Sequence, residues 1–155
     1  MTEKEISPKA RAEAAESQAP VRRKHTEVAV GVLLRESDGA LLITSRPPGK
    51  PYAGYWEFPG GKVEPGERPE QALIRELKEE LDIDVQAACL APFVFASHGY
   101  ETFHLLMPLY LCRRWSGVVK AREHARLAWV KPDRLRDYPM PPADEPPVAW
   151  LRDLL

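Results

Sequence analysis

The chain has 155 residues, of which 44% are hydrophobic and 29% are charged, and its formal net charge at pH 7 is −1. This length and apolar content suffice for one compact core, so we expect a single domain. The nearly balanced charge excludes the broad basic face that wraps polymeric nucleic acid, and it leaves room for a small anionic ligand held by a few local cations.

The first third of the chain predicts a tail, two strands and a loop. Residues 1–24 are polar and have no sustained apolar stripe, so we expect a flexible tail before a domain that spans residues 25–155. From Thr26 apolar residues alternate with smaller or polar ones, which predicts a strand. A Ser-Asp-Gly turn leads to the apolar residues 41–43, which predicts a hairpin. Residues 46–55 hold three prolines and two glycines and predict a surface loop.

The next segment predicts a helix with one apolar and one acidic face. Pro69 suits the first turn of a helix, and Glu67 and Glu70 stand where the positive end of the helix dipole favours acids. We expect the helix to end near Leu81. Its core-facing stripe contains leucines at helical spacing, with two smaller apolar neighbours: Leu73, Leu77, Leu81, Ala72 and Ile74.

The remainder of the chain predicts more strands than helices. Residues 85–97 and 102–113 are expected to be strands, joined by a short turn, and residues 127–130 form another short strand. Residues 132–137 suit a helical turn, and residues 144–155 suit a C-terminal amphipathic helix. The pattern predicts an α+β fold with the acidic helix near its centre.

Three carboxylates crowd one side of the predicted helix. Glu76, Glu79 and Glu80 are three and four residues apart, so their side chains are neighbours and repel one another in water. A hard divalent cation such as Mg²⁺, or Mn²⁺ in its place, would relieve this repulsion, because carboxylate oxygens without soft ligands suit these ions. The competing interpretation is a solvated helix face whose charges pair with one another.

Residues beside the carboxylates support a site rather than a plain surface. Gly60 and Gly61 let the backbone approach a ligand closely, so a main-chain carbonyl there could join the metal ligands. Arg75 stands four residues before Glu79 and is able to hold a glutamate in one orientation.

The stretch from Gly61 to Ile83, GKVEPGERPEQALIRELKEELDI, resembles the Nudix box, G-x5-E-x7-R-E-U-x-E-E-x-G-U with U aliphatic. The matching positions are Gly61, Glu67, Arg75, Glu76, Leu77, Glu79, Glu80 and Ile83. One position differs, because Asp82 stands where the box has its second glycine. We expect Asp82 to adopt the left-handed conformation at the helix end, which aspartate tolerates better than most residues, at a small cost in stability.

The resemblance to Nudix hydrolases of the MutT branch extends from residue 26 to the C-terminus. It includes Ile-Thr-Ser-Arg at 43–46, Trp-Glu-Phe-Pro-Gly-Gly-Lys at 56–62 and Pro-Pro-Ala-Asp-Glu-Pro at 141–146. The resemblance implies a Nudix α/β/α sandwich with a central mixed β-sheet. It also implies magnesium-dependent cleavage of a nucleoside triphosphate to the monophosphate and pyrophosphate. In this branch the activity is associated with sanitising oxidised nucleotides, chiefly 8-oxo-dGTP, and so with DNA repair and mutation avoidance.

Site residues carried over by position fall into two groups. The metal ligands and catalytic residues implied by the resemblance are Glu76, Glu79, Glu80, the Gly60 carbonyl, Arg75 and Glu123 from a separate loop. The implied substrate-binding residues are Arg46 as a phosphate contact, Glu57, Phe58 and Asp144. The general base stays open among the three helix glutamates and a loop acid such as Glu123, because the choice depends on which oxygens the metal leaves free.

Asp144 keeps the identity of the base open. In this branch the Pro-Pro-Ala segment normally presents an asparagine to the base, and an amide both donates and accepts, whereas a carboxylate only accepts. A protonated Asp144 would restore the match to 8-oxo-dGTP, and an ionised one suits guanine N1–H and N2–H or a cytosine amino group. The alternatives are therefore a CTP or 5-methyl-dCTP pyrophosphohydrolase and, more distantly, a catalytically silent nucleotide- or partner-binding module. A structural alternative is that Asp144 only caps the final helix.

The sequence also bears on compartment and assembly. No apolar run approaches the roughly 20 residues of a membrane-spanning helix, and the N-terminus lacks an apolar signal core. Cys89 and Cys112 lack metal-type spacing and suit a reducing compartment. We expect a cytoplasmic protein with a small-molecule nucleoside triphosphate as its partner, no membrane association and a monomeric state, with a homodimer left open.

Overall fold

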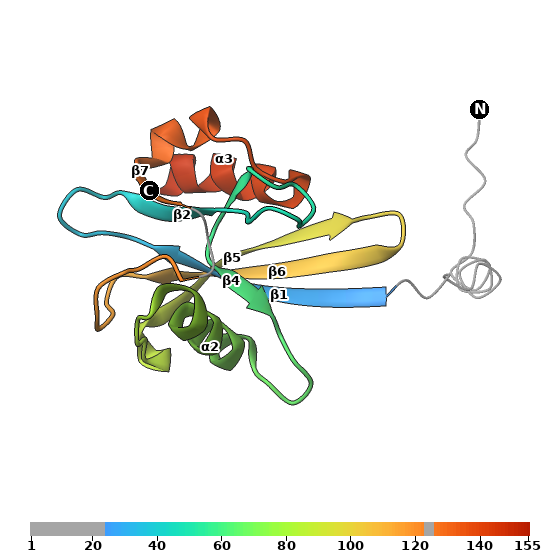
Figure 1. Cartoon of the computed structure of the whole chain (residues 1–155), viewed down its shortest axis with the longest axis horizontal. Helices are drawn as coiled ribbons and strands as arrows, with labels where there is room; N and C mark the ends of the chain where they lie inside the picture. The colour runs from blue at the N-terminus through green and yellow to red at the C-terminus, as the bar shows by residue number, and fades with distance from the viewer. Residues whose placement is uncertain (1–23, 123–125) are drawn as a thin grey trace, which may run out of the picture.

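The computed structural model describes residues 24–122 and 126–155, and its strands and helices form an α/β/α arrangement (Figure 1). The strands are β1 Lys24–Leu33, β2 Leu41–Ser45, β3 Trp56–Glu57, β4 Gly60–Lys62, β5 Leu90–Gly99, β6 Phe103–Cys112 and β7 Leu127–Val130. The α-helices are α2 Pro69–Leu81 and α3 Glu145–Leu154, and the 3₁₀ helices are η1 Ala87–Cys89, η2 Pro132–Asp137 and η3 Pro142–Asp144. No helix in the described part of the chain has the length and apolarity needed to cross a membrane.

The central sheet is mixed, as expected for the α+β fold class. Its four strands follow the order β4-β1-β6-β5, with β1 parallel to β6 and the other two pairs antiparallel. A second, antiparallel sheet of three strands has the order β3-β2-β7. The helix α2 lies on one side of the central sheet and α3 on the other (Figure 1).

The predicted hairpin between the first two strands is wrong. A single bridge between Leu34 and Leu41 connects them, and β1 and β2 belong to different sheets. The physical reason is that β2 pairs with β3 and β7 in the second sheet, while β1 pairs with β4 and β6 in the central sheet. Hydrogen bonds within the 35–40 turn close the connection without a ladder, since the Arg35 N–H donates to the Ala40 carbonyl over 2.9 Å.

Two apolar clusters lie on the two faces of β1. Val30 and Val32 belong to the cluster that includes β2 and α3, whereas Ala29 and Leu33 belong to the cluster that contains α2. The predicted stripe of α2 is confirmed, because Ala72, Leu73, Leu77 and Leu81 are fully buried and Ile74 packs beside them. The alternating side chains of β1 therefore contact the α3 layer on one face of the sheet and the α2 layer on the other. Because the apolar face of α2 packs on β1, the glutamates lie on another face of the helix.

Some element boundaries differ from the prediction. The first strand begins at Lys24 rather than Thr26, and residues 1–23 of the expected tail lie outside the described part of the chain. The strand expected from residue 85 begins at Leu90, because Asp84 first bridges to Ser116 and a turn of η1 redirects the chain toward β6. The short strand β7 and the helical turn η2 have the predicted bounds.

Candidate active site

The helix that carries the glutamates begins and ends as its sequence predicts. Pro69 is its first residue, and the Arg68 N–H donates to the Gln71 side-chain oxygen over 2.9 Å. At the other end Asp82 has φ 57° and ψ 37°, so it adopts the predicted left-handed conformation. Its N–H donates to the Lys78 carbonyl over 3.1 Å, and its carboxylate lies 3.3 Å from the Lys78 ammonium. The helix therefore ends in the left-handed conformation expected for the second glycine of the box, although Asp82 occupies that position.

Two adjacent glycines allow the backbone of β4 to lie close to its neighbours. A Cβ on Gly61 would lie 2.3 Å from the carboxyl carbon of Glu76. A Cβ on Gly60, which has φ 152°, would lie 2.1 Å from the Ala29 carbonyl oxygen. Gly61 therefore makes room for the Glu76 carboxylate, and Gly60 makes room for β1.

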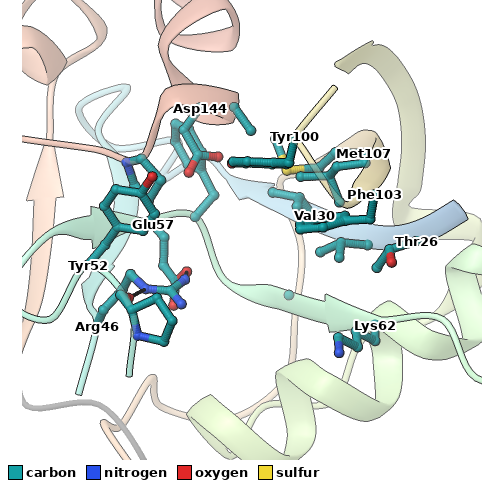
Figure 2. Close-up of a pocket in the computed structure, with 17 residues that line it drawn as sticks. Thr26, Val30, Arg46, Tyr52, Glu57, Lys62, Tyr100, Phe103, Met107 and Asp144 are labelled. Atoms are coloured by element: carbon teal, nitrogen blue, oxygen red, sulfur yellow. Dashed lines mark hydrogen bonds and ion pairs between the residues drawn. The ribbon is translucent and has the colours of Figure 1, made fainter. Parts of the chain in front are cut away.

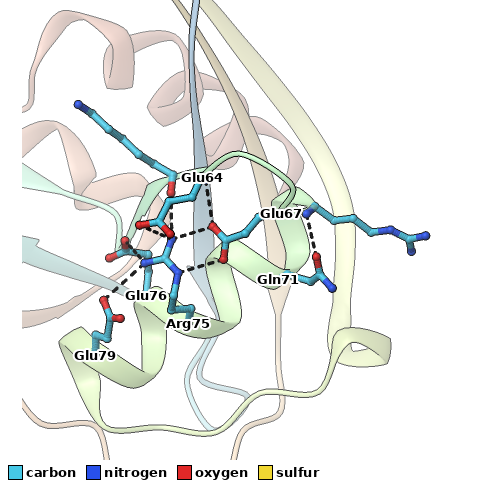
Figure 3. A network of polar contacts seen from close by, with 8 residues as sticks. Glu64, Glu67, Gln71, Arg75, Glu76 and Glu79 are labelled. Carbon is cyan, nitrogen blue, oxygen red and sulfur yellow. Dashed lines mark hydrogen bonds and ion pairs between the residues drawn. The ribbon is translucent and has the colours of Figure 1, made fainter.

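Arg75 organises the acidic side chains around it (Figure 3). Its Nε and Nη2 donate to the two oxygens of Glu67 over 3.0 and 2.9 Å, and its Nη1 donates to Glu76 over 2.9 Å. Nη2 also donates to the Lys62 carbonyl, and Nη1 lies 3.6 Å from Glu79. The hydrogen bonds from Arg75, followed by one from the Glu64 N–H, lower the pKa of Glu67 to about 2. The predicted orienting role of Arg75 thus applies most directly to Glu67 and Glu76.

The three box glutamates line one cavity of about 750 Å³, which we call the acidic cavity. Glu80 is buried, and its Oε2 accepts a long hydrogen bond of 3.4 Å from the Gly60 N–H. Burial, and then the charges of Glu80 and Glu79, raise the pKa of Glu76 against the opposing effect of Arg75. The same cavity is lined by Gly60, Gly61, Glu64 and the cations Arg46, Lys50 and Lys62.

The donor set of the acidic cavity fits a hard divalent cation. Its candidate ligands are carboxylate oxygens with backbone oxygens beside them, and mutual repulsion among the glutamates is the kind of strain that a cation relieves. Among the described residues, however, no three Asp, Glu, His or Cys side chains are gathered closely enough to hold a metal. Arg75 donates to Glu76, and the three carboxylates share a cavity without being gathered at one point.

A second cavity of about 530 Å³ adjoins the first (Figure 2). We call it the base pocket, after the nucleobase that the Nudix resemblance of the sequence implies for Asp144. The two cavities are adjacent, because both are lined by Val28, Arg46, Glu57, Gly60 and Lys62. The apolar side of the base pocket comes from β1, β6 and the strand end at Phe58, through Val28, Val30, Phe58, Phe103, Leu105 and Met107. Its polar groups include Arg46, Glu57 and Asp144, which come from three separate segments.

Asp144 lies in the base pocket and does not cap the helix that follows it. It occupies the residue before α3, yet its side chain makes no capping hydrogen bond. Only 7% of its surface is exposed, and burial, reinforced by the negative charge of Glu57 and opposed by Arg46, raises the pKa of its carboxyl to about 7. The capping interpretation is therefore wrong, and Asp144 is a buried acid that changes charge near neutral pH.

Arg46 is bound to protein groups. Its Nη1 donates to Glu57 over 2.5 Å, and its Nε donates to the Pro51 carbonyl over 2.7 Å. The side chain lines both cavities, so it stands where the two meet. Phe58 is buried and contributes to the core as well as to the base pocket.

Glu123, the acid expected from a separate loop, lies outside the described residues. The chain just before it is tied to the end of α2, since the Lys120 N–H donates to the Leu81 carbonyl and the Arg122 N–H donates to the Glu80 carbonyl, each over 3.0 Å. Residues 120–122 therefore lie against the C-terminal end of α2, next to Glu80.

The sequence did not reveal the aromatic and apolar side chains that complete the base pocket. Tyr52, Tyr100 and Met107 all line it. Alternation along residues 103–112 places Phe103, Leu105 and Met107 on one face, which is a usable signal once the sheet order is known. Tyr52 stands in a loop rich in Pro and Gly, where nothing in the local pattern predicts a direction for its ring.

Comparisons with known proteins agree with this geometry. The sequence model of the NUDIX domain matches residues 29–149. The CTP pyrophosphohydrolase of Escherichia coli K12 is 41% identical over 125 residues, which cover 79% of this chain and 88% of that protein. The 8-oxo-dGTP diphosphatase of the same strain is 36% identical over 131 residues, which cover 84% of this chain and 99% of that protein.

Solved structures show the same fold. The solution structure of the E. coli ORF135 protein superposes with a TM-score of 0.77 at 33% identity, covering 88% of this chain and 95% of that one. A MutT structure from a study of Aliivibrio salmonicida and Vibrio cholerae has a TM-score of 0.72 at 33% identity, covering 85% of this chain and all of that one. The α/β/α sandwich with a central mixed sheet is therefore confirmed.

Proposed function

The chain belongs to the NUDIX family and is a Nudix hydrolase, and on this premise we propose that it is a Mg²⁺-dependent nucleoside triphosphate pyrophosphohydrolase of MutT type. Its proposed substrate is 8-oxo-dGTP, which it hydrolyses to the monophosphate and pyrophosphate. The observation that carries the proposal is the meeting of an acidic cavity, lined by the box glutamates, with a base pocket that ends at a buried acid.

The proposed metal ligands are the carboxylates of Glu76, Glu79 and Glu80 and the Gly60 carbonyl, with Glu123 as a further ligand. When bound by these residues, Mg²⁺, or Mn²⁺ in its place, would neutralise phosphate oxygens and make a water molecule more acidic. Arg75 contributes by holding Glu76 and Glu67 in fixed orientations, so that little reorganisation is needed when the triphosphate arrives. One of the glutamates then accepts the proton of the attacking water.

The proposed base-reading groups are Asp144 and Glu57, with Phe58 as an apolar contact. Oxidation of guanine at C8 creates an N7–H donor beside the O6 acceptor. A neutral Asp144 carboxyl can accept from the former and donate to the latter, as the asparagine amide of the branch does. Because burial raises the pKa of Asp144 to about 7, the neutral form is available near neutral pH. Arg46 is the proposed phosphate contact, which its place in the lining of both cavities supports.

A second candidate substrate class is CTP or 5-methyl-dCTP. The specific observations that favour it are the two carboxylates in the base pocket, which suit an amino-group donor, and the 41% identity to a CTP pyrophosphohydrolase. The base in this case would meet an ionised Asp144. A silent binding module is the third candidate, and the presence of every carboxylate of the box argues against it.

The remaining expectations belong to the same proposal. We place the enzyme in the cytoplasm, because its proposed substrates form the cellular nucleotide pool and its two cysteines carry no disulfide. We further propose that residues 25–155 act as one monomeric domain on a free nucleotide, with no role for polymeric nucleic acid.

The test is pyrophosphate release, with and without Mg²⁺, from 8-oxo-dGTP, dGTP, CTP and 5-methyl-dCTP at matched concentrations well below saturation. We expect magnesium-dependent release and a clear preference for 8-oxo-dGTP. A preference for either cytosine nucleotide would transfer the assignment to the second candidate. Nucleotide binding without turnover of any of the four would reject the enzyme and favour the binding module.

A further inference from the structure

The mouth of the base pocket carries an exposed tyrosine to which the reaction gives no role. Tyr52 belongs to the loop of residues 46–55, lines the pocket and keeps 43% of its surface exposed. Figure 2 shows its ring on the side of the pocket opposite Val30 and Met107. The pocket thus has an apolar wall on the sheet and an aromatic ring on the loop, with space for a flat ligand between them.

The backbone of Tyr52 has an unusual conformation. Its φ is 59°, in the left-handed region that disfavours residues with bulky side chains. Gly49 and Gly54 on either side have φ values of 85° and 83°, which glycine adopts readily. Such an outlier persists only where the surrounding structure determines it, and in proteins it concentrates where ligands are held.

Arg46 supplies the bonds that determine the loop. Its N–H donates to the Tyr55 carbonyl over 2.7 Å, and its own carbonyl accepts from the Gly54 N–H over 3.3 Å. Its side-chain Nε donates to the carbonyl of Pro51, the residue directly before Tyr52, over 2.7 Å. Glu57 holds the other side of the same guanidinium. One residue therefore closes the base of the loop and fixes the approach to Tyr52.

We propose that Tyr52 is a substrate-contacting residue that covers the nucleobase from the loop side, and that Arg46 is the positioning residue that holds it there. The inference rests on the proposed function, because it takes the base pocket to bind a nucleobase. An aromatic ring stacks on any base, so Tyr52 contributes affinity, whereas Asp144 and Glu57 read the edge of the base. Substrate binding would bury the exposed ring.

The chain offers a matched control for Tyr52. Tyr55 lies in the same loop, is 40% exposed, and contacts the Tyr52 ring at 5.5 Å between centroids, yet it lines a different cavity. We expect Tyr52→Ala to weaken binding of 8-oxo-dGMP and of CMP about tenfold in calorimetry without metal, as loss of one stacking contact does. The KM for the triphosphate should rise by a similar factor while kcat stays within about twofold. Tyr52→Phe and Tyr55→Ala should retain wild-type binding.

A ligand without a base separates a base contact from damage to the loop. 2′-Deoxyribose 5′-triphosphate keeps the phosphates, so the wild type and Tyr52→Ala should bind it equally. The proposal would be overturned if Tyr52→Ala bound this ligand as weakly, relative to the wild type, as it binds 8-oxo-dGMP. It would also be overturned if Tyr55→Ala lost as much affinity for 8-oxo-dGMP as Tyr52→Ala does. If the wild type binds 8-oxo-dGMP in a Tyr52-dependent way but hydrolyses no triphosphate, the proposed function fails and the base contact stands.

The role of Arg46 is tested by a double-mutant cycle. Arg46→Lys keeps the charge but cannot reach Pro51 and Glu57 with one planar group. We expect it to weaken 8-oxo-dGMP binding in the wild-type background and to add little in the Tyr52→Ala background, because both changes remove the same contact. Fully additive losses would show that Arg46 acts independently of Tyr52 and would overturn its positioning role.

Discussion

The acidic cavity and the base pocket are built in different ways. Most of the acidic cavity comes from one contiguous stretch, in which the glycines of β4 make room for the glutamates that the helix α2 presents. The base pocket is assembled from the 46–55 loop, β1, β6 and the segment before α3. Most of the proposed metal ligands are therefore encoded locally, whereas the proposed base-reading groups come together from distant parts of the chain.

The largest expected effect tests whether the two cavities act independently. Glu80→Gln removes one negative charge from the acidic cavity and keeps the size of the side chain. Because a metal supplies several kcal/mol of charge stabilisation in the transition state, loss of a ligand should lower kcat/KM for the preferred triphosphate by about a hundredfold or more. Binding of the monophosphate without metal should change little, since Glu80 itself does not line the base pocket.

The control for this variant is Glu36→Gln, a change at an exposed acid in the turn after β1. Both variants should melt near the wild-type temperature, which circular dichroism would measure. Near-wild-type turnover of Glu80→Gln would remove Glu80 from the site. A loss of monophosphate binding in the same variant would show that the two cavities are coupled.

The second prediction concerns Asp144 and is specific to the base pocket. Its carboxyl has a pKa of about 7, so it is mostly neutral below pH 7 and mostly ionised above it. If the substrate is 8-oxo-dGTP, KM should be lower at pH 6 than at pH 8, because the neutral acid both donates and accepts. If the substrate is a cytosine nucleotide, the order should reverse. Asp144→Asn should make KM for 8-oxo-dGTP insensitive to this pH change, with Mg²⁺ dependence preserved.

The same group links pH to stability. The folded-state pKa of Asp144 is raised from 3.8 to about 7, so its favourable contribution is complete below the unfolded pKa and is lost as pH rises toward 7. This rise in the pKa of Asp144 corresponds to at most about 4 kcal/mol of folding free energy at pH 8. Asp144→Asn should therefore be more stable than the wild type in urea at pH 8, and the difference should vanish at acidic pH. An equal difference at both pH values would contradict the raised pKa.

The contrast between the cavities also explains how far the sequence could predict the site. The helix α2 and its glutamates follow from a pattern of neighbouring residues, and so does the left-handed conformation of Asp82. The hairpin prediction failed because the partners of β1 lie in β4 and β6, and no local pattern reveals them. Tyr52 and Met107 remained hidden for the same reason, since each is an ordinary loop or strand residue until the fold places it in the same pocket as Asp144.

The smallest expected effect concerns Asp82, the one residue that differs from the box. It tests whether this difference affects stability or the acidic cavity. Asp82 has φ 57°, and a side chain in this conformation costs of order 1 kcal/mol that glycine avoids. Asp82→Gly also removes exposed ion pairs with Lys78 and Arg122, which contribute little in water. We expect the variant to be more stable by about 0.5–1 kcal/mol in urea unfolding. Its kcat/KM should match the wild type.

Gly39→Ala is the reverse change, because it adds a side chain at a left-handed position instead of removing one. Gly39 has φ 73°, lies in the turn after β1 outside the box, and has open space around it. A Cβ there introduces strain without a collision, so this variant should lose stability by about 1 kcal/mol and keep its activity. If Asp82→Gly instead lowers stability, the ion pairs of Asp82 outweigh its backbone strain. If it changes kcat/KM, the helix end helps to place Glu79 or Glu80, and the acidic cavity depends on more than its ligands.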